Sequence, residues 1–294
     1  MIEIIDLGFQ GIPKAIGAYV VPDAEGVTLV ECGPFSTHDN LLAGMERLGY
    51  KPDDVHTVLL THIHFDHAGA AWWWAERGAH VYVHPRGLDH MIDPSRLYGS
   101  AKQIYGDFMD QLWGRMENID PARITAVEDR QVLSIGGQTW TVHHTPGHAK
   151  HHIAWQLEDT VFTGDVGGIR VNGGPVVPPF PPPDIDLIAW RKSIERLREL
   201  NAKRFYLTHF GPSDEIEEHL AGLERRMELY AVWMAPHAAA GTPAEDLVQP
   251  FAQFVDAELL ESGLPESLLE SYTIANPAYM SVTGLLRAYA KGLI

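Results

Sequence analysis

The chain has 294 residues, of which 45% are hydrophobic, and its formal net charge is −17. So acidic a chain repels phosphate backbones, which argues against a nucleic-acid-binding protein. Cys32 is the only cysteine, which excludes an intrachain disulfide and a cysteine-based zinc site. We find neither a signal peptide nor an apolar run near the ~20 residues that span a bilayer. We therefore expect a cytoplasmic protein with no membrane partner.

Hydrophobic spacing predicts the first elements. Residues 16–21 and 27–31 are rich in valine and indicate two adjacent strands joined by a turn. Apolar side chains recur every three or four residues over 38–49, which predicts an amphipathic helix. The apolar run 55–60 predicts a buried strand, and it leads directly into the most informative part of the chain.

Residues 61–67 read Thr-His-Ile-His-Phe-Asp-His. His62 and His64 are two positions apart, so an extended backbone points them to the same side. Asp66 and His67 follow after a turn and are able to face a second point nearby, so one cluster is able to supply ligands to two metal ions. Imidazole and carboxylate ligands favour zinc, iron or manganese over calcium or magnesium. The alternative is a polar loop without a ligand role.

Strands and turns dominate the middle of the chain. Residues 68–78 predict a helix and 80–84 predict an alternating strand, and 86–118 is an insertion that carries several aromatic residues. Residues 124–144 predict a β-meander with a Gly-Gly turn before its last strand. The Pro-Gly turn that follows projects His148 back over the cluster.

Two later strands each end at a side chain of ligand type. The strand predicted over 160–163 leads to Asp165, and the strand predicted over 204–207 leads to His209. Taken alone, Asp165 also suits the role of a helix or turn cap. Two-metal hydrolases, however, use an aspartate that places one oxygen on each metal. The region 213–294 is predicted to be helical.

These motifs resemble the metallo-β-lactamase superfamily, whose signature is His-x-His-x-Asp-His followed by a later His, a later Asp and a last His at strand ends. The resemblance covers about residues 1–212. It implies an α/β (α+β) fold: a four-layer αββα sandwich in the catalytic domain, 1–212, with a C-terminal helical extension, 213–294. Many members have Val-Asp-Thr-Gly where this chain has Val30-Glu31-Cys32-Gly33. That departure bears on hydrogen bonds near the site and not on the metal ligands.

The resemblance also implies a centre of two divalent metal ions, zinc first, with iron or manganese as alternatives. The implied ligands are His62, His64 and His148 for one ion, Asp66, His67 and His209 for the other, and Asp165 as the bridge between them. A hydroxide shared by the two ions attacks a carbonyl or phosphoryl centre in such a site. Asp66 is the residue expected to orient it, so no serine or cysteine nucleophile is needed.

The favoured activity is hydrolysis of a thioester, a lactone or another carboxylic ester of small-molecule size. The alternatives are a small-molecule phosphodiesterase, a persulfide-type non-haem iron dioxygenase, and a metal-holding sensor or ligand-binding module without catalysis. Arg170 and Phe180, in the loop after Asp165, are candidate substrate contacts, and so is Tyr105 in the 86–118 insertion. The C-terminal helices either wall the substrate pocket or form a homodimer interface.

Overall fold

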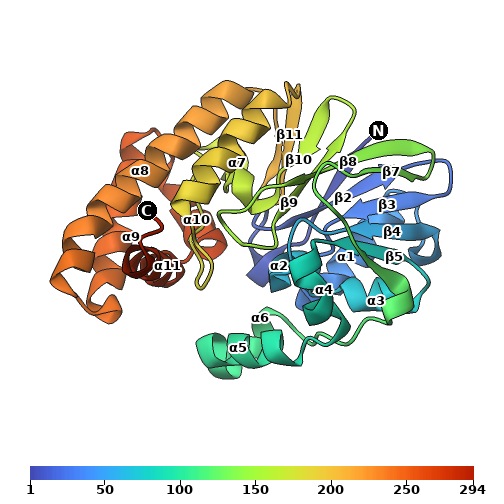
Figure 1. Ribbon diagram of the computed structural model, residues 1–294, viewed down its shortest axis with the longest axis horizontal. Helices are drawn as coiled ribbons and strands as arrows, with labels where there is room; N and C mark the ends of the chain where they lie inside the picture. Colours follow the sequence, from blue (N-terminus) through green and yellow to red (C-terminus); the bar gives the residue numbers. More distant parts are fainter. The chain divides into compact units, whose positions relative to one another are not determined.

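The computed structural model describes residues 1–294, which fold as two units. Unit 1 comprises Met1–His144 and His151–Phe162, and unit 2 comprises Thr145–Lys150 and Thr163–Ile294. Figure 1 colours their elements along the chain, with unit 1 mostly in blue and green and unit 2 mostly in yellow to red. None of the helices combines the length and the apolarity that a membrane crossing requires.

The first sheet of unit 1 has six strands in the order β1-β2-β3-β4-β5-β6. Their bounds are β1 Glu3–Asp6, β2 Gly17–Pro22, β3 Val27–Val30, β4 Val55–Leu59, β5 His80–Val83 and β6 Ile124–Ala126. β1, β2 and β3 pair antiparallel, whereas β3 to β6 pair parallel. Val30 is the register partner of Leu59. The residues that follow β3 and β4 therefore leave the sheet at the same edge, and the His/Asp motif begins there.

Six helices complete this half of unit 1: α1 His38–Arg47, α2 Phe65–Ala68, α3 Ala71–Glu76, α4 Pro85–Ile92, α5 Ser95–Tyr105 and α6 Met109–Leu112. α1, α3 and α4 pack against strands of the first sheet (Figure 1). The helix predicted over 68–78 is confirmed in its centre as α3. Consecutive helical side chains point about 100° apart. Accordingly Trp72 and Trp74 are buried, while Trp73 is half-buried beneath the guanidinium of Arg77.

The second sheet contributes four antiparallel strands to unit 1 in the order β10-β9-β8-β7. Their bounds are β7 Val132–Ile135, β8 Gln138–His144, β9 Ile153–Leu157 and β10 Thr160–Phe162. Aromatic side chains join the two sheets: Tyr19 meets Phe162 edge-on at 5.3 Å, and the indole of Trp155 donates to the carbonyl of Leu60 at 2.9 Å. Unit 1 is thus a sandwich of two sheets with its core between them.

The β-meander predicted over 124–144 is wrong in its first strand. β6 joins the first sheet instead, where Ile124 pairs in parallel with Val81 of β5. Only β7 and β8 form the predicted hairpin, around the turn at 136–137. The apolar pattern of 124–126 identifies a strand but carries no information about its partner, and the short segment after it carries the chain from one sheet to the other.

Unit 2 is mainly helical and contains a single hairpin of two strands. Its elements are α7 Leu187–Glu199, β11 Arg204–Leu207, β12 Gly211–Ser213, α8 Ile216–Ala240, α9 Ala244–Glu261, α10 Leu269–Ala275 and α11 Ala278–Lys291. The strand predicted over 204–207 and the helical character of 213–294 are confirmed. α7 begins after Asp186, whose carboxylate accepts from the backbone N–H of Ala189 at 2.8 Å and caps the helix.

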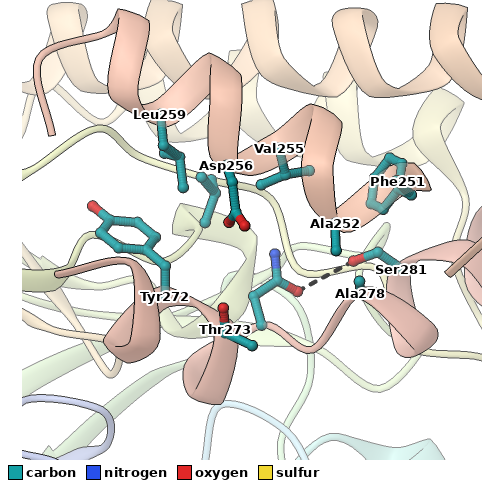
Figure 2. A pocket seen from close by; sticks show the side chains of 11 residues that line it. Phe251, Ala252, Val255, Asp256, Leu259, Tyr272, Thr273, Ala278 and Ser281 are labelled. Atoms are coloured by element: carbon teal, nitrogen blue, oxygen red, sulfur yellow. Dashed lines mark hydrogen bonds between the residues drawn. The ribbon is translucent and has the colours of Figure 1, made fainter. Parts of the chain in front are cut away.

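The C-terminal helices hold the proline-rich loop that follows Asp165 in the same unit. The hydroxyl of Tyr272 donates to the carbonyl of Pro175 at 2.7 Å, and the amide of Asn276 donates to the carbonyl of Pro178 at 3.2 Å. Figure 2 shows the narrow crevice between α9 and the α10–α11 segment, where Ser281 donates to Asn276 at 3.2 Å. Burial raises the pKa of Asp256 on the wall of this crevice.

Candidate metal centre

Unit 1 brings its four predicted ligands together immediately after β4. His64 has an extended backbone, and the chain turns into α2 at Phe65, so the motif changes direction halfway. Nε2 of His62 lies 2.9 Å from Nδ1 of His64, and the ring centres of His62 and His67 are 4.0 Å apart. Asp66 Oδ2 lies 3.7 Å from His67 Nε2. His62 and His67 are buried, whereas His64 and Asp66 are half-buried.

A buried acid supports this cluster from the end of β3. Glu31 adopts a positive φ of 64° and turns its carboxylate toward the residues that follow β4. Oε1 accepts from the Thr61 hydroxyl at 2.5 Å and lies 3.0 Å from Nδ1 of His67. In the sequence, Glu31 is recognisable as a departure from the family pattern but not as a contact of the ligands. A charged residue at the end of a buried strand, next to the edge where the motif starts, is the signal that indicates such a role.

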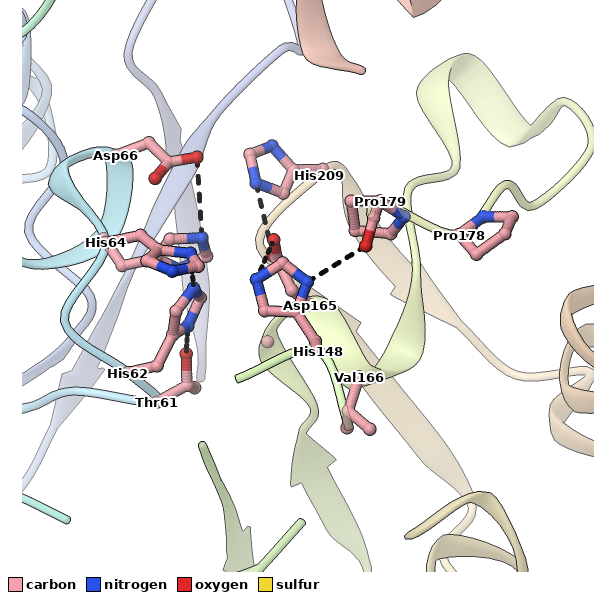
Figure 3. A network of polar contacts seen from close by, with 12 residues as sticks. Thr61, His62, His64, Asp66, His148, Asp165, Val166, Pro178, Pro179 and His209 are labelled. Carbon is pink, nitrogen blue, oxygen red and sulfur yellow. Dashed lines mark hydrogen bonds and ion pairs between the residues drawn. The ribbon is translucent and has the colours of Figure 1, made fainter. Parts of the chain in front are cut away.

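Unit 2 brings its three predicted ligands together around one carboxylate. Asp165 Oδ2 lies 3.3 Å from Nε2 of His148, and Oδ1 lies 3.3 Å from Nε2 of His209 (Figure 3). All three side chains are buried. Each oxygen of Asp165 therefore faces a different imidazole.

The ring of His148 is oriented by the proline-rich loop. Nδ1 donates to the carbonyl of Pro179 at 3.1 Å, which leaves Nε2 with its lone pair facing Asp165. The turn that carries His148 packs directly on α7, because a Cβ at Gly147 would lie 2.4 Å from the Cα of Trp190. Nothing in the sequence indicates the role of the Pro179 carbonyl, since a backbone acceptor is available at almost every position.

The donors of both units suit a transition-metal ion. Imidazoles and carboxylates make up the whole set, and burying such groups is costly unless a cation or hydrogen bonds compensate. Clusters of histidine and aspartate in the chain are able to bind metal ions. Each ring whose Nδ1 is held by an oxygen acceptor presents Nε2, the usual ligand atom of histidine. The residues therefore fit the metal that their chemistry implies.

The three candidate substrate contacts have different environments. The guanidinium of Arg170 donates to Ser213 Oγ at 2.9 Å and to the carbonyl of Gly174 at 3.1 Å, which braces its own loop in unit 2. Phe180 has no exposed surface and packs edge-on against Trp190 at 5.6 Å, so it is a core residue of unit 2. Tyr105 is half-buried at the end of α5 in unit 1. Their contact with substrate stays a prediction.

Three comparisons place the chain among known proteins. The metallo-β-lactamase fold-containing protein ST1585 of Sulfurisphaera tokodaii is 32% identical over 231 residues, which are 76% of this chain and 85% of that protein. Its crystal structure matches 75% of this chain and 84% of that chain with a TM-score of 0.62. The atrochrysone carboxyl ACP thioesterase dmxR1 of Cryptosporiopsis is 24% identical over 230 residues, 74% of this chain and 59% of that protein.

The fold extends over the whole chain in one further structure. The metallo-β-lactamase family protein TTHA1429 of Thermus thermophilus matches 99% of this chain and 94% of its own, with a TM-score of 0.66 at 19% identity. The predicted fold class, a mixed α/β sandwich with a C-terminal helical region, is confirmed. The model of the metallo-β-lactamase superfamily matches residues 13–209, from before β2 to the last predicted ligand. This chain therefore belongs to the metallo-β-lactamase superfamily.

Proposed function

We propose that the protein is a metal-dependent hydrolase with a centre of two divalent ions, zinc first. The assignment of ligands follows the family: His62, His64 and His148 for one ion, Asp66, His67 and His209 for the other, and Asp165 for both. The observation that carries this proposal is the division of the Asp165 oxygens, each 3.3 Å from a different histidine. The four clustered donors after β4 support it.

Bound ions of this kind supply Lewis acidity, and a single zinc already lowers the pKa of water to about 7. The remaining work falls to residues of the chain. The carboxylate of Asp66, with 22% of its side chain exposed, is positioned to accept a proton or a hydrogen bond from an attacking water. His148 is held in one orientation by Pro179. Burial raises the pKa of the Cys32 thiol, which suits a packing residue and not a nucleophile.

For the substrate we propose a small thioester or another carboxylic ester. The similarity to a thioesterase that covers 74% of this chain supports a carbonyl centre. The formal charge of −17 favours a small substrate over a polyanionic one. A small phosphodiester is the second substrate class that this chemistry accommodates, because the same Lewis acidity stabilises charge on a phosphoryl oxygen.

Metal analysis and a substrate panel test the proposal. Purified protein is expected to contain close to two divalent ions per chain and to hydrolyse a thioester or lactone faster than an activated phosphodiester. Asp165→Asn keeps the size of the side chain but weakens both contacts of the carboxylate, so it is expected to lose metal and turnover while circular dichroism stays unchanged. Iron together with oxygen consumption and no hydrolysis would remove the protein from the hydrolase class.

A further inference from the structure

Three donors of unit 1 converge on the carboxylate of Glu31, whose side chain is only 1% exposed. Oε1 accepts a hydrogen bond from the Thr61 hydroxyl at 2.5 Å and lies 3.0 Å from Nδ1 of His67. Oε2 accepts a hydrogen bond from the backbone N–H of Thr61 at 3.3 Å. The parallel register of β3 and β4 makes this meeting possible, because Glu31 and Thr61 leave the sheet at the same edge.

The direction of each hydrogen bond follows from what each group offers. An ionised carboxylate only accepts, so His67 Nδ1 carries a proton and donates it to Glu31. The Thr61 hydroxyl has one proton, which it also gives to Glu31. Its oxygen lies 3.0 Å from Nδ1 of His62 and has lone pairs left to accept with. His62 therefore carries its proton on Nδ1 as well, an assignment made from the network of contacts.

Glu31 thus acts on two histidines, on His67 directly and on His62 through Thr61 (Figure 3 shows Thr61 against His62). We propose that Glu31 is the positioning residue for both metal ions, holding one ligand of each set in the tautomer that presents Nε2. The inference rests on the proposed function, in which His62 and His67 belong to different ions. One buried carboxylate then couples the two halves of the centre.

The network has two arms: Glu31 contacts His67 directly, and it contacts His62 through Thr61. Two substitutions separate these arms. Glu31→Leu keeps a side chain of similar volume but has no acceptor oxygen, so the Thr61 hydroxyl and His67 Nδ1 lose the acceptor that they share. Both arms are then disturbed. Thr61→Val removes the hydroxyl and breaks the arm to His62 alone, whereas Thr61→Ser retains it. Asp23→Asn is the matched control, because Asp23 contacts His56 at 2.9 Å elsewhere in unit 1.

The first measurement uses metal-free protein with 15N-labelled histidine. Long-range proton–nitrogen spectra report which ring nitrogen carries the proton. Wild type, Thr61→Ser and Asp23→Asn are expected to show the Nδ1–H form for His62 and His67. Thr61→Val loses it for His62 only, and Glu31→Leu loses it for both. Retention of the Nδ1–H form at both rings in Glu31→Leu would overturn the inference.

The second measurement is competition for zinc against a chelator of known affinity. Glu31→Leu is expected to weaken the binding of both ions by about 10–100-fold, the usual effect of removing such a hydrogen bond, and Thr61→Val to weaken the binding of only one. Equal weakening of both ions by Thr61→Val contradicts the two-arm network, and the Thr61 pair decides the matter even if Glu31→Leu does not fold. If wild-type protein binds no divalent ion, the proposed function is wrong. The tautomers of His62 and His67 are still tested by the spectra of the metal-free protein.

Discussion

The turn that carries His148 offers a sharp test of how the site is held, through the substitution Gly147→Ala. Gly147 has φ +142°, and an added Cβ would lie 2.4 Å from both Cα and Cβ of Trp190 and 2.6 Å from its backbone nitrogen. Ordinary contact begins at 3.4 Å, so the turn and α7 must separate by about 1 Å to relieve the 2.4 Å approach. The obstacle is helix backbone, which yields less readily than a side chain.

Two costs add in this variant. Overpacking of this kind destabilises by about 1–3 kcal/mol. The positive φ costs a further ~1–3 kcal/mol for a residue with a Cβ. Gly173→Ala in the same unit carries a positive-φ cost without overpacking, because Gly173 has φ +72° and nothing lies within 4 Å of its Cβ position. A Cβ is tolerated less well at φ +142° than at +72°, so the difference between the variants is expected to be at least the ~1–3 kcal/mol that overpacking costs.

Urea unfolding followed by tryptophan fluorescence measures both variants, and zinc competition is run beside it. Gly147→Ala should unfold at lower urea than Gly173→Ala and bind zinc more weakly, because displacement of the turn moves His148 away from Pro179 and Asp165. Gly173→Ala should keep the zinc affinity of the wild type. Equal midpoints and equal zinc affinities for the two variants would refute the view that the turn is held in place by direct packing on α7.

Three further changes have defined outcomes. Phe180→Ala should cost about 3–5 kcal/mol in urea unfolding because the ring is fully buried, whereas Phe108→Ala, at a 65% exposed ring, should stay within about 0.5 kcal/mol; similar losses would contradict the core assignment. Burial lowers the pKa of His219 to about 4 from 6.5, so the unfolded chain takes up the proton first and stability falls as the pH drops from 6.5 toward 4. His219→Gln should flatten that dependence of the urea midpoint, and an unchanged slope would be the contrary result. Cys32→Ala should leave turnover unchanged in a steady-state assay, and abolished turnover in a folded variant would reopen a nucleophilic role for the thiol.

Much of the local structure follows from the sequence because it depends on short-range patterns. The apolar run before residue 61 fixes β4 as a buried strand, and the spacing of His62 and His64 fixes their common direction. The hairpin of β7 and β8 follows from alternation and the Gly-Gly turn. The neighbours of a strand in the sheet do not follow from such patterns, since β6 has the same sequence pattern whether it pairs with β5 or with β7.

The hydrogen bonds that orient the predicted ligands could not be predicted from the sequence, for a physical reason. His148 is oriented by a backbone carbonyl of Pro179, and the side chain at that position says nothing about where its carbonyl points. Glu31 stands 36 residues before its partner His67, so only the parallel register of β3 and β4 reveals their contact. Candidate ligands are recognisable in the sequence by the chemistry of their side chains, whereas the groups that support them are identified only by the path of the chain.

The hydrogen bonds from the C-terminal helices to the proline-rich loop have a consequence for shortened forms of this protein. A chain cut after β12 would still contain all seven proposed ligands, yet it would lack Tyr272 and Asn276, which tether the segment leading to Pro179. Its His148 would then be free to rotate. Removal of the C-terminal helices is thus expected to loosen the ring of His148, more than a hundred positions earlier in the chain. Metal retention therefore reports whether these helices are in place.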